Sequence, residues 1–411
     1  MAEGKIIVYL FMLGMLFFGT ANTIIGKAMD LSHGNGHIFN HPYFQTAMMF
    51  AGETFCLGFY FLYLKMSKTA AAENASVKVP LTGKDKKRSC LEKMGKFVFI
   101  IPSFFDFCAS TLMFLGLVLS APSVYQMMRG FIMVVVAIYS VVFLRIKLFP
   151  HQLLGVSLAF IGVAIVGLAS VLYEASSAKN PVLGIIIIII AQFFAGGVFV
   201  SEQLFLENIV VHPLQAVGIE GCSGFAYYLI VLPIFNLIPC NNPDMCNGGY
   251  IENSIEAFRQ VGDSTNLMLC FWGFMFSIAF FNFTGVTVTK KAGALARSTI
   301  DTSRTLIIWG FSIGVGWEAF IPLQLVGFFF LVLGTLVYNE VLKIPWFGLT
   351  ESITKKHEYM KHRAEMKHQK VQDNEIDYVG YSPGAIYDAS HFNKEEKVNA
   401  SGFDMDIKRE G

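Results

Sequence analysis

The hydrophobic positions of this chain lie in long uninterrupted stretches separated by short polar segments. A bilayer whose hydrocarbon core is ~30 Å thick needs ~20 apolar residues for each helix that crosses it. Ten stretches have this length, and we expect each to form a membrane-spanning helix. Their continuity excludes a transmembrane β-barrel, in which apolar and polar residues alternate. The expected helices cover residues 6–26, 43–64, 97–118, 122–144, 151–173, 182–204, 214–237, 264–288, 294–314 and 320–342.

The first stretch has two interpretations. Lys5 precedes an apolar run, and the small residues 19–21 resemble the site at which a secretory signal peptide is cleaved. However, the run continues through Ile24 and Ile25, and the internal repeat described below requires this helix. We therefore expect it to be retained.

Composition supports a membrane protein. Of the 411 residues, 54% are hydrophobic and only 15% are charged, whereas soluble domains have about 25% charged residues. This balance excludes a soluble multidomain protein and a disordered chain. The net charge of +1 indicates no nucleic-acid partner.

The basic residues predict the orientation in the lipid bilayer. With a cytosolic N-terminus, most of the 31 Lys and Arg residues fall on the cytosolic side, above all in the loop 65–96 and in the tail. Because cytosolic loops carry the excess of basic residues, we expect both termini in the cytosol. The charged tail is expected to be largely disordered.

An internal repeat divides the membrane region into two halves. A pattern of Pro, Gln, Leu and two Gly in the fifth stretch recurs in the tenth, and two weaker matches follow in the same order. Each half holds five helices, an odd number, so the second half enters the membrane upside down. The predicted fold is an all-α membrane protein of ten transmembrane helices in two inverted five-helix repeats. The predicted domains are 1–175, 176–345 and the cytosolic tail 346–411.

Seven charged residues lie inside the expected helices, more than two residues from either end. Translocon scales put one charge at a helix centre at ~2.5–3.5 kcal/mol, so seven facing lipid would cost ~20 kcal/mol. They must therefore line a hydrated cavity or pair with one another. These residues are Glu53, Asp106, Arg129, Glu220, Arg297, Asp301 and Arg304.

Their spacing favours a shared solute site. Arg297, Asp301 and Arg304 lie on one face of one helix, and Gln126 shares a face with Arg129. The repeat makes these two helices equivalent, so their arginine faces can meet. Guanidinium groups bind carboxylates and phosphates in a bidentate manner, which indicates an anionic or polar organic solute.

Alternatives remain open at several of these positions. Asp301 and Arg304 can form a structural ion pair that needs no substrate. Glu53 and Glu220 can be proton carriers or buried neutral acids. His33, His37 and His41 recur every four residues, as ordinary loop histidines or as a metal site or acid sensor.

Other motifs predict little chemistry. Cys240 and Cys246 share one non-cytosolic loop, where a disulfide is one of two outcomes. The chain has no P-loop, zinc motif or nucleophile elbow. We therefore expect no enzyme activity, no catalytic residue, no metal and no cofactor.

Five stretches and one tryptophan carry a family resemblance: 126–130, 214–221, 277–285, 288–290 and 301–305, with Trp309. They resemble the drug/metabolite transporter superfamily (EamA-like) and, within it, the F branch of the solute carrier 35 family. The resemblance covers about residues 5 to 345. It includes Asn282, which joins the candidate substrate-binding residues. The Leu-Asn-Lys motif of many nucleotide-sugar transporters is absent, and residues 293–297 occupy its place, so the nucleotide-sugar substrate stays open.

The resemblance implies further properties. Helices 1–4 and 6–9 would enclose the cavity, and helices 5 and 10 would lie outside it, often at a homodimer contact. It implies an endomembrane location, lysosomal for the nearest branch, with the Golgi, endoplasmic reticulum and mitochondria as alternatives. It also implies the adenine nucleotide carrier as a protein partner.

Glycines predict how helices 5 and 10 pack. Gly155 and Gly162, like Gly327 and Gly334, lie two helical turns apart and line one face. Small residues let another backbone approach, so we expect these faces against neighbouring helices of their own half or against a second protomer.

Two functions are consistent with the sequence. The first is a secondary transporter of a small, anionic or polar metabolite that works by alternating access. The second is a non-transporting membrane scaffold or regulator that acts through protein partners. The charges inside the expected helices favour the first.

Overall fold

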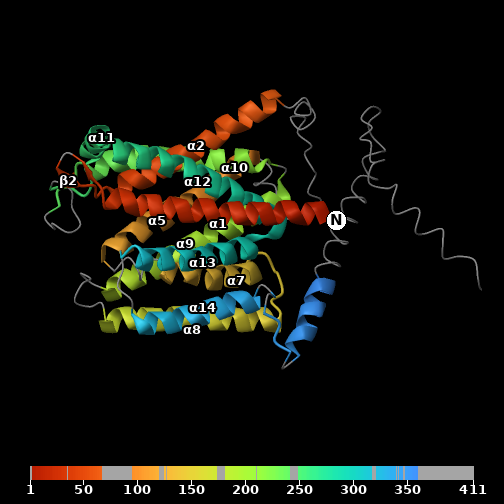
Figure 1. The fold of residues 1–411 in the computed structure, drawn as a ribbon. Coiled ribbons are helices and arrows are strands. Elements are labelled where there is room, and N and C mark those ends of the chain that lie inside the picture. The colour runs from red at the N-terminus through yellow and green to blue at the C-terminus, as the bar shows by residue number, and fades with distance from the viewer. Residues whose placement is uncertain are drawn as a thin grey trace, which may run out of the picture. The chain divides into compact units, whose positions relative to one another are not determined.

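In the residues that it describes, the computed structural model consists almost entirely of helices (Figure 1). Residues up to Lys356 form one compact unit. In the part of the chain that is described, the strands are β1 (His33–Gly34) and β2 (His37–Ile38), which form a short antiparallel hairpin. The structure describes residues 2–34, 36–66, 95–119, 125, 127–173, 181–209, 211–240, 249–316, 321–338, 340, 342–345 and 348–359.

Seven helices in these residues are long and apolar enough to cross a membrane. Together they make the chain a multi-pass membrane protein. They are α1 (Ala2–Asp30), α2 (Pro42–Met66), α5 (Ile100–Leu119) with the preceding 3₁₀ helix η1 (Gly95–Phe99), α8 (Pro150–Tyr173), α9 (Pro181–Asn208), α10 (Pro213–Phe235) and α12 (Thr265–Ala292).

Three more helices coincide with the remaining expected stretches. Helix α13 (Ala294–Gly314) matches its stretch in full but carries three charged residues. The shorter apolar helices are Arg129–Val142, which comprises the 3₁₀ helix η2 (Arg129–Phe131) and α7 (Ile132–Val142), and α14 (Pro322–Tyr338). Within the expected stretch 122–144 the backbone is 3₁₀ at Arg129–Phe131, and residues 122–124 and 126 lie outside the described residues.

Proline sets where many of these helices begin. Its missing N–H and fixed φ suit the first position of a helix, where the N–H has no partner within the helix. At the start of α10, His212 Nδ1 also accepts a hydrogen bond from the Leu214 N–H at 3.3 Å. The helices that begin with proline are α2, α8, α9, α10 and α14.

The most extensive helix contacts pair α1 with α12, α2 with α10, α5 with α9, and α8 with α14. The last pair packs glycine against glycine. A Cβ built on Gly162 would lie 2.6 Å from the Gly327 carbonyl oxygen, and one built on Gly334 would lie 2.5 Å from that of Gly155. The glycine faces of α8 and α14 therefore contact each other across the two proposed halves. The expectation that they face their own half or a second protomer was wrong.

Helix α11 (Ser254–Asp263) was not expected from the sequence. It is too short to cross a membrane, and it is amphipathic, with Ala257 and Val261 buried and Phe258 exposed. The side chain of Asn253 accepts a hydrogen bond from the Glu256 N–H at 3.1 Å and so caps the first turn. Figure 1 shows α11 and the hairpin at the end of the helices away from the N-terminus.

The first turns of the tail pack on the body of the compact unit. Residues 349–356 are helical. His151 Nδ1 lies 2.6 Å from Ser352 Oγ, and Lys356 Nζ lies 2.5 Å from Glu340 Oε1. The tail is therefore helical at its start, where the sequence is charged and compatible with a helix. The cytosolic loop at 67–94 and the tail beyond 359 lie outside the described residues.

Candidate substrate cavity

A cavity of about 1420 Å³ lies among the helices. Its lining begins at the hairpin and α11, and this end is called the mouth below. From there the lining reaches inward to Glu202 and Arg297. Among the described residues, α8 and α14 contribute none to the lining. This confirms the expectation that helices 5 and 10 lie outside the cavity.

Two guanidinium groups share one carboxylate in the middle of the cavity. Arg304 Nη2 lies 2.8 Å from Asp301 Oδ1, and Arg129 Nη2 lies 3.8 Å from Asp301 Oδ2. Asp301 is therefore flanked by one arginine of its own helix and one of η2. With all three ionised, this guanidinium cluster (Arg129, Asp301, Arg304) carries a net charge of +1.

The guanidinium cluster keeps hydrogen-bonding capacity. Within the described residues, Arg129 Nε and the Nε and Nη2 atoms of Arg304 are buried and donate no hydrogen bond. The contact of Arg304 Nη2 with Asp301 is thus an ion pair without hydrogen-bond alignment. The Arg129 side chain as a whole is 18% exposed and lines the cavity, so its guanidinium group can bind an acceptor there.

A second arginine pair marks the inner end of the cavity. Arg297 Nη1 of α13 contacts Glu202 Oε2 of α9, and both side chains are buried. Nearby, Gln203 Oε1 accepts a hydrogen bond from the Ala294 N–H at 2.7 Å, at the start of α13. Lys290 Nζ donates to the Val211 carbonyl oxygen at 2.7 Å. These contacts join α9, α12 and α13 at the end opposite the mouth.

Three acidic side chains of the cavity make no ion pair with an arginine among the described residues. Glu53 Oε1 accepts a hydrogen bond from Asn282 Nδ2 at 2.6 Å, and Asp106 Oδ1 accepts one from Ser110 Oγ at 3.2 Å. Glu220 Oε1 is buried without a hydrogen-bond partner.

Eight of the nine candidate residues line this one cavity, and Gln126 lies outside the described residues. Sequence reasoning missed Glu202, which falls two residues before the end of its expected helix. The missed signal was the basic residue Arg297, which needed a buried acidic partner on another helix. The eight residues are Glu53, Asp106, Arg129, Glu220, Asn282, Arg297, Asp301 and Arg304.

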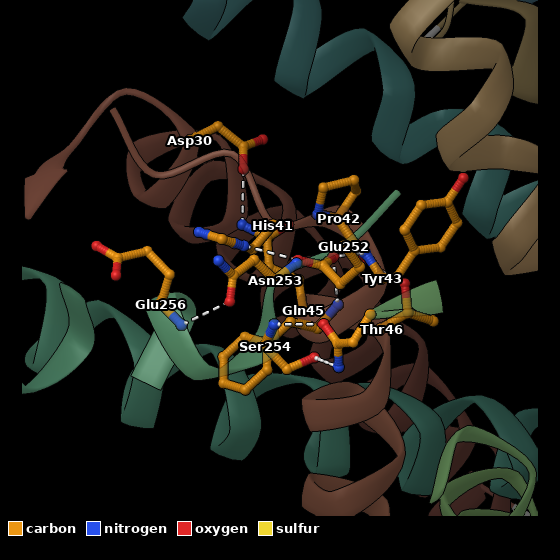
Figure 2. Close-up of polar contacts among 12 residues, drawn as sticks. Asp30, His41, Pro42, Tyr43, Gln45, Thr46, Glu252, Asn253, Ser254 and Glu256 are labelled. Atoms are coloured by element: carbon orange, nitrogen blue, oxygen red, sulfur yellow. Dashed lines mark hydrogen bonds and ion pairs between the residues drawn. The ribbon is translucent and has the colours of Figure 1, made fainter. Parts of the chain in front are cut away.

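A buried hydrogen bond between two side chains holds the mouth together (Figure 2). His41 Nδ1 lies 2.6 Å from Glu252 Oε1, and both side chains are 0% exposed. Glu252 Oε2 also accepts hydrogen bonds from the Tyr43 and Phe44 N–H groups, each at 3.2 Å, and so caps the start of α2. His41 is therefore a buried partner of Glu252 and differs from an ordinary loop histidine.

A neighbouring contact joins α1 to α2 at the mouth. Gln45 Nε2 donates to Asp30 Oδ1 at 2.6 Å (Figure 2). His33 and His37 lie in the hairpin and are exposed. Within the described residues, no group of three His, Cys, Asp or Glu side chains could hold a metal ion.

Cys240 is disulfide-bonded. Its expected partner, Cys246, lies outside the described residues, so this pairing stays a prediction. Four other cysteines, all described, are free: Cys56, Cys108, Cys222 and Cys270.

Comparison with known proteins gives relatives over most of the chain. A Mus musculus protein named solute carrier family 35 member F6 is 35% identical over 341 residues, which cover 80% of this chain and 88% of that protein. The Homo sapiens protein of the same name is 35% identical over 340 residues, with the same coverage. An uncharacterised protein of Schizosaccharomyces pombe is 33% identical over 333 residues, which cover 80% of this chain and 97% of that protein. No protein-family model matches the chain.

The apolar helices and the solute-carrier relatives define a multi-pass membrane transporter in the general sense. The chain belongs to the F branch of solute carrier family 35.

Proposed function

We propose that the chain is a secondary transporter that carries a small, polar and anionic metabolite by alternating access. The observation that carries this proposal is the guanidinium cluster, a group with a net positive charge that lines a cavity of about 1420 Å³ and in which the Arg129 side chain is 18% exposed. A carboxylate or phosphate in the cavity would accept hydrogen bonds from the guanidinium group and balance the net positive charge of the cluster.

The proposed fold is ten transmembrane helices in two inverted five-helix repeats, the drug/metabolite transporter arrangement. The helix contacts support it. Exchanging each helix with its repeat partner converts the α1–α12 contact into the α9–α5 contact, and it converts α2–α10 and α8–α14 into themselves. A pseudo-two-fold axis in the membrane plane has this effect. The halves are 1–175 and 176–345, with the tail 346–411 in the cytosol.

The proposed substrate-binding residues are the eight of the cavity together with Gln126. Arg129 and Arg304 bind the anionic group of the solute. Asn282 and the acidic side chains contact its polar groups. Alternating access would open the end held by Glu202 and Arg297 and close the mouth.

The proposed setting is an endomembrane, lysosomal first and Golgi, endoplasmic reticulum or mitochondrial otherwise, with both termini cytosolic. A homodimer through α8 and α14 would use their outer surfaces, on which Phe160 and Phe329 are exposed, since their glycine faces contact each other. An association with the adenine nucleotide carrier rests on family resemblance alone.

A scaffold or regulator without transport is the alternative. It would have no use for a large cavity lined by buried charges. Such charges are unfavourable in a membrane and are kept where a pathway needs them. The cavity therefore favours transport.

Uptake by reconstituted vesicles tests the proposal. Purified protein in liposomes is exposed to a panel of radiolabelled organic anions, zwitterions and cations. We expect uptake of at least one anion, with a loss of about tenfold or more in Arg129→Ala, because a hydrogen bond to a charged group contributes about 1.5–3 kcal/mol.

Arg259→Ala is the matched control, since Arg259 is exposed on α11 and does not line the cavity. Equal uptake by wild type and Arg129→Ala would contradict the proposed role of the guanidinium cluster. No uptake of any solute by wild type would favour the scaffold.

A further inference from the structure

Acidic side chains outnumber basic ones among the buried charges of the cavity. Arg297 pairs with Glu202, and Arg129 and Arg304 share Asp301. The proposed solute is an anion and cannot neutralise the acids that remain. Something else must neutralise them. Leaving aside Lys27, Asp30 and Glu256 at the mouth, the lining has five acids, Glu53, Asp106, Glu202, Glu220 and Asp301, against three arginines.

Glu220 is the least satisfied of these acids. Glu220 is 8% exposed and lines the cavity. Its Oε1 atom is buried without a hydrogen-bond partner in the described part of the chain. Ser103 Oγ donates to the backbone carbonyl oxygen of Glu220 at 2.7 Å, which holds the helix in place and leaves the carboxyl group untouched. By contrast, Glu53 and Asp106 each accept a side-chain hydrogen bond.

The charged side chains around Glu220 are mostly acidic, and a single arginine offsets their negative charge only in part. Glu53 of α2, Asp106 of α5 and Glu202 of α9 are its acidic neighbours, and Arg297 of α13 is the basic one. Helix α12 contributes the uncharged Asn282, which donates to Glu53. The α2 and α10 backbones are in contact here, because a Cβ on Gly221 would lie 2.6 Å from that of Glu53. An ionised Glu220 would thus be a poorly compensated buried charge.

The size of the site selects the ligand. Glu220 Oε1 is closed to water-sized contacts, so a hydrated or partly hydrated metal ion cannot reach it. No described group of three acidic, His or Cys side chains is arranged to hold a metal ion. A proton needs no such space. It neutralises the carboxyl group and turns one oxygen into a hydrogen-bond donor.

We propose that Glu220 binds a proton while the cavity is open at the mouth, and that this proton crosses the membrane once in each cycle of solute transport. Glu220 as a whole is 8% exposed and lines the cavity, and its carboxylate takes H⁺ from hydronium in the cavity water to form a carboxylic acid, with no other bond made or broken. Arg297 is the group that displaces the proton. When the inner end opens, its guanidinium leaves Glu202 and stabilises an ionised Glu220, which releases H⁺ on that side. The coupling step rests on the proposed transport function, whereas the proton site itself does not.

Infrared difference spectroscopy of the purified full-length protein tests the proton site without any solute. At neutral pH we expect a carbonyl stretching band of a protonated carboxylic acid that Glu220→Gln removes. Glu207→Gln is the matched control and should leave this band in place, since Glu207 is exposed and does not line the cavity. Glu220→Asp retains a carboxylic acid and should keep a shifted band, which guards against a folding defect in the glutamine variant. An unchanged spectrum in Glu220→Gln would overturn the proton site.

Vesicle uptake with an imposed pH gradient tests the coupling. For one proton moved with each solute, a gradient of one pH unit supports about tenfold in solute concentration ratio, because one unit corresponds to 1.36 kcal/mol. We expect the ratio of uptake with and without the gradient to rise in wild type and to fall to one in Glu220→Gln. A wild-type ratio of one would overturn the coupling. Absence of any uptake would instead count against the transport function, while the infrared result would still decide the proton site.

Discussion

Each arginine of the cavity lies over an aromatic ring. The guanidinium carbon of Arg297 lies 4.2 Å from the centre of the Phe199 ring, and that of Arg304 lies 4.6 Å from the centre of Phe281. Such contacts contribute about 0.5–2 kcal/mol and fix the guanidinium plane. Glycines make room for them. A Cβ on Gly19 would lie 2.6 Å from Arg304 Nη1 and 2.7 Å from the Phe281 ring.

Gly19→Ala should therefore move Arg304 off Phe281. We expect the KM for the transported anion to rise about tenfold, since small misplacements of a binding group are costly. Uptake kinetics in proteoliposomes measure it. Gly58→Ala is the matched control, because nothing lies within 4 Å of a Cβ built there. An unaltered KM in Gly19→Ala would mean that Arg304 does not contact the solute.

A charge exchange separates binding from structure at Arg129. Arg129→Asp alone should destabilise the protein by about 3–5 kcal/mol, since it leaves buried charges uncompensated. Arg129→Asp combined with Asp301→Arg should recover most of the thermal stability, because an ion pair is restored. Uptake should stay lost, because the acceptor site has moved. Recovery of uptake together with stability would indicate a purely structural pair.

The contact of His41 with Glu252 at the mouth gives a third prediction. His41→Ala should destabilise the protein by about 1–3 kcal/mol, because Glu252 loses a buried hydrogen-bond partner. Thermal unfolding in detergent measures this loss. His37→Ala, at an exposed position of the hairpin, is the control and should have little effect. Equal unfolding temperatures for wild type and His41→Ala would show that Glu252 is satisfied by its backbone contacts alone.

Functional residues could be predicted from the sequence only where burying a charged side chain in the membrane is energetically unfavourable. The unfavourable burial of Glu53, Arg129 and Asp301 was enough to place them in one cavity. The same reasoning could not find Glu252, because a carboxylate in a polar loop costs nothing until the loop folds over His41. Glu202 was missed for a related reason, since a charge near a helix end is normally solvated.

At the level of elements, the lengths of the apolar stretches predicted where the helices lie. They did not predict irregularities within a helix. The bounds of α13 match the sequence prediction in full. The 3₁₀ backbone of η2 was not predicted, although Gly130 lies within it. A mid-helix 3₁₀ segment often marks a hinge, and here it carries an arginine of the cavity.

The glycine contact of α8 with α14 makes Gly162 sensitive to size. Gly162→Leu should reduce thermal stability by about 1–3 kcal/mol or more, because its Cβ would meet the backbone of Gly327, which cannot yield. Selectivity across the solute panel should not change, since α8 does not line the cavity. Ala164→Leu, at an exposed position of the same helix, is the control. A stable Gly162→Leu protein with altered selectivity would contradict this placement of α8.

For the whole molecule, the central claim is that one cavity is reached in turn from each side of the membrane. The internal repeat suggested this from sequence, because inverted halves can exchange their conformations. In the structure, the lining of the cavity runs from the mouth to the inner end, where Glu202 pairs with Arg297. Which solute drives the exchange could not be predicted, because an arginine cluster fits many anions.

The most direct test is the reactivity of a cysteine placed in the cavity. Met49 of α2 lines the cavity, and Met49→Cys in oriented vesicles can be exposed to a membrane-impermeant thiol reagent on either side. Wild type gives the background from native cysteines. We expect labelling from the mouth side and, separately, from the opposite side, with the balance shifted by the transported anion. Labelling from the mouth side alone, with and without the anion, would contradict alternating access.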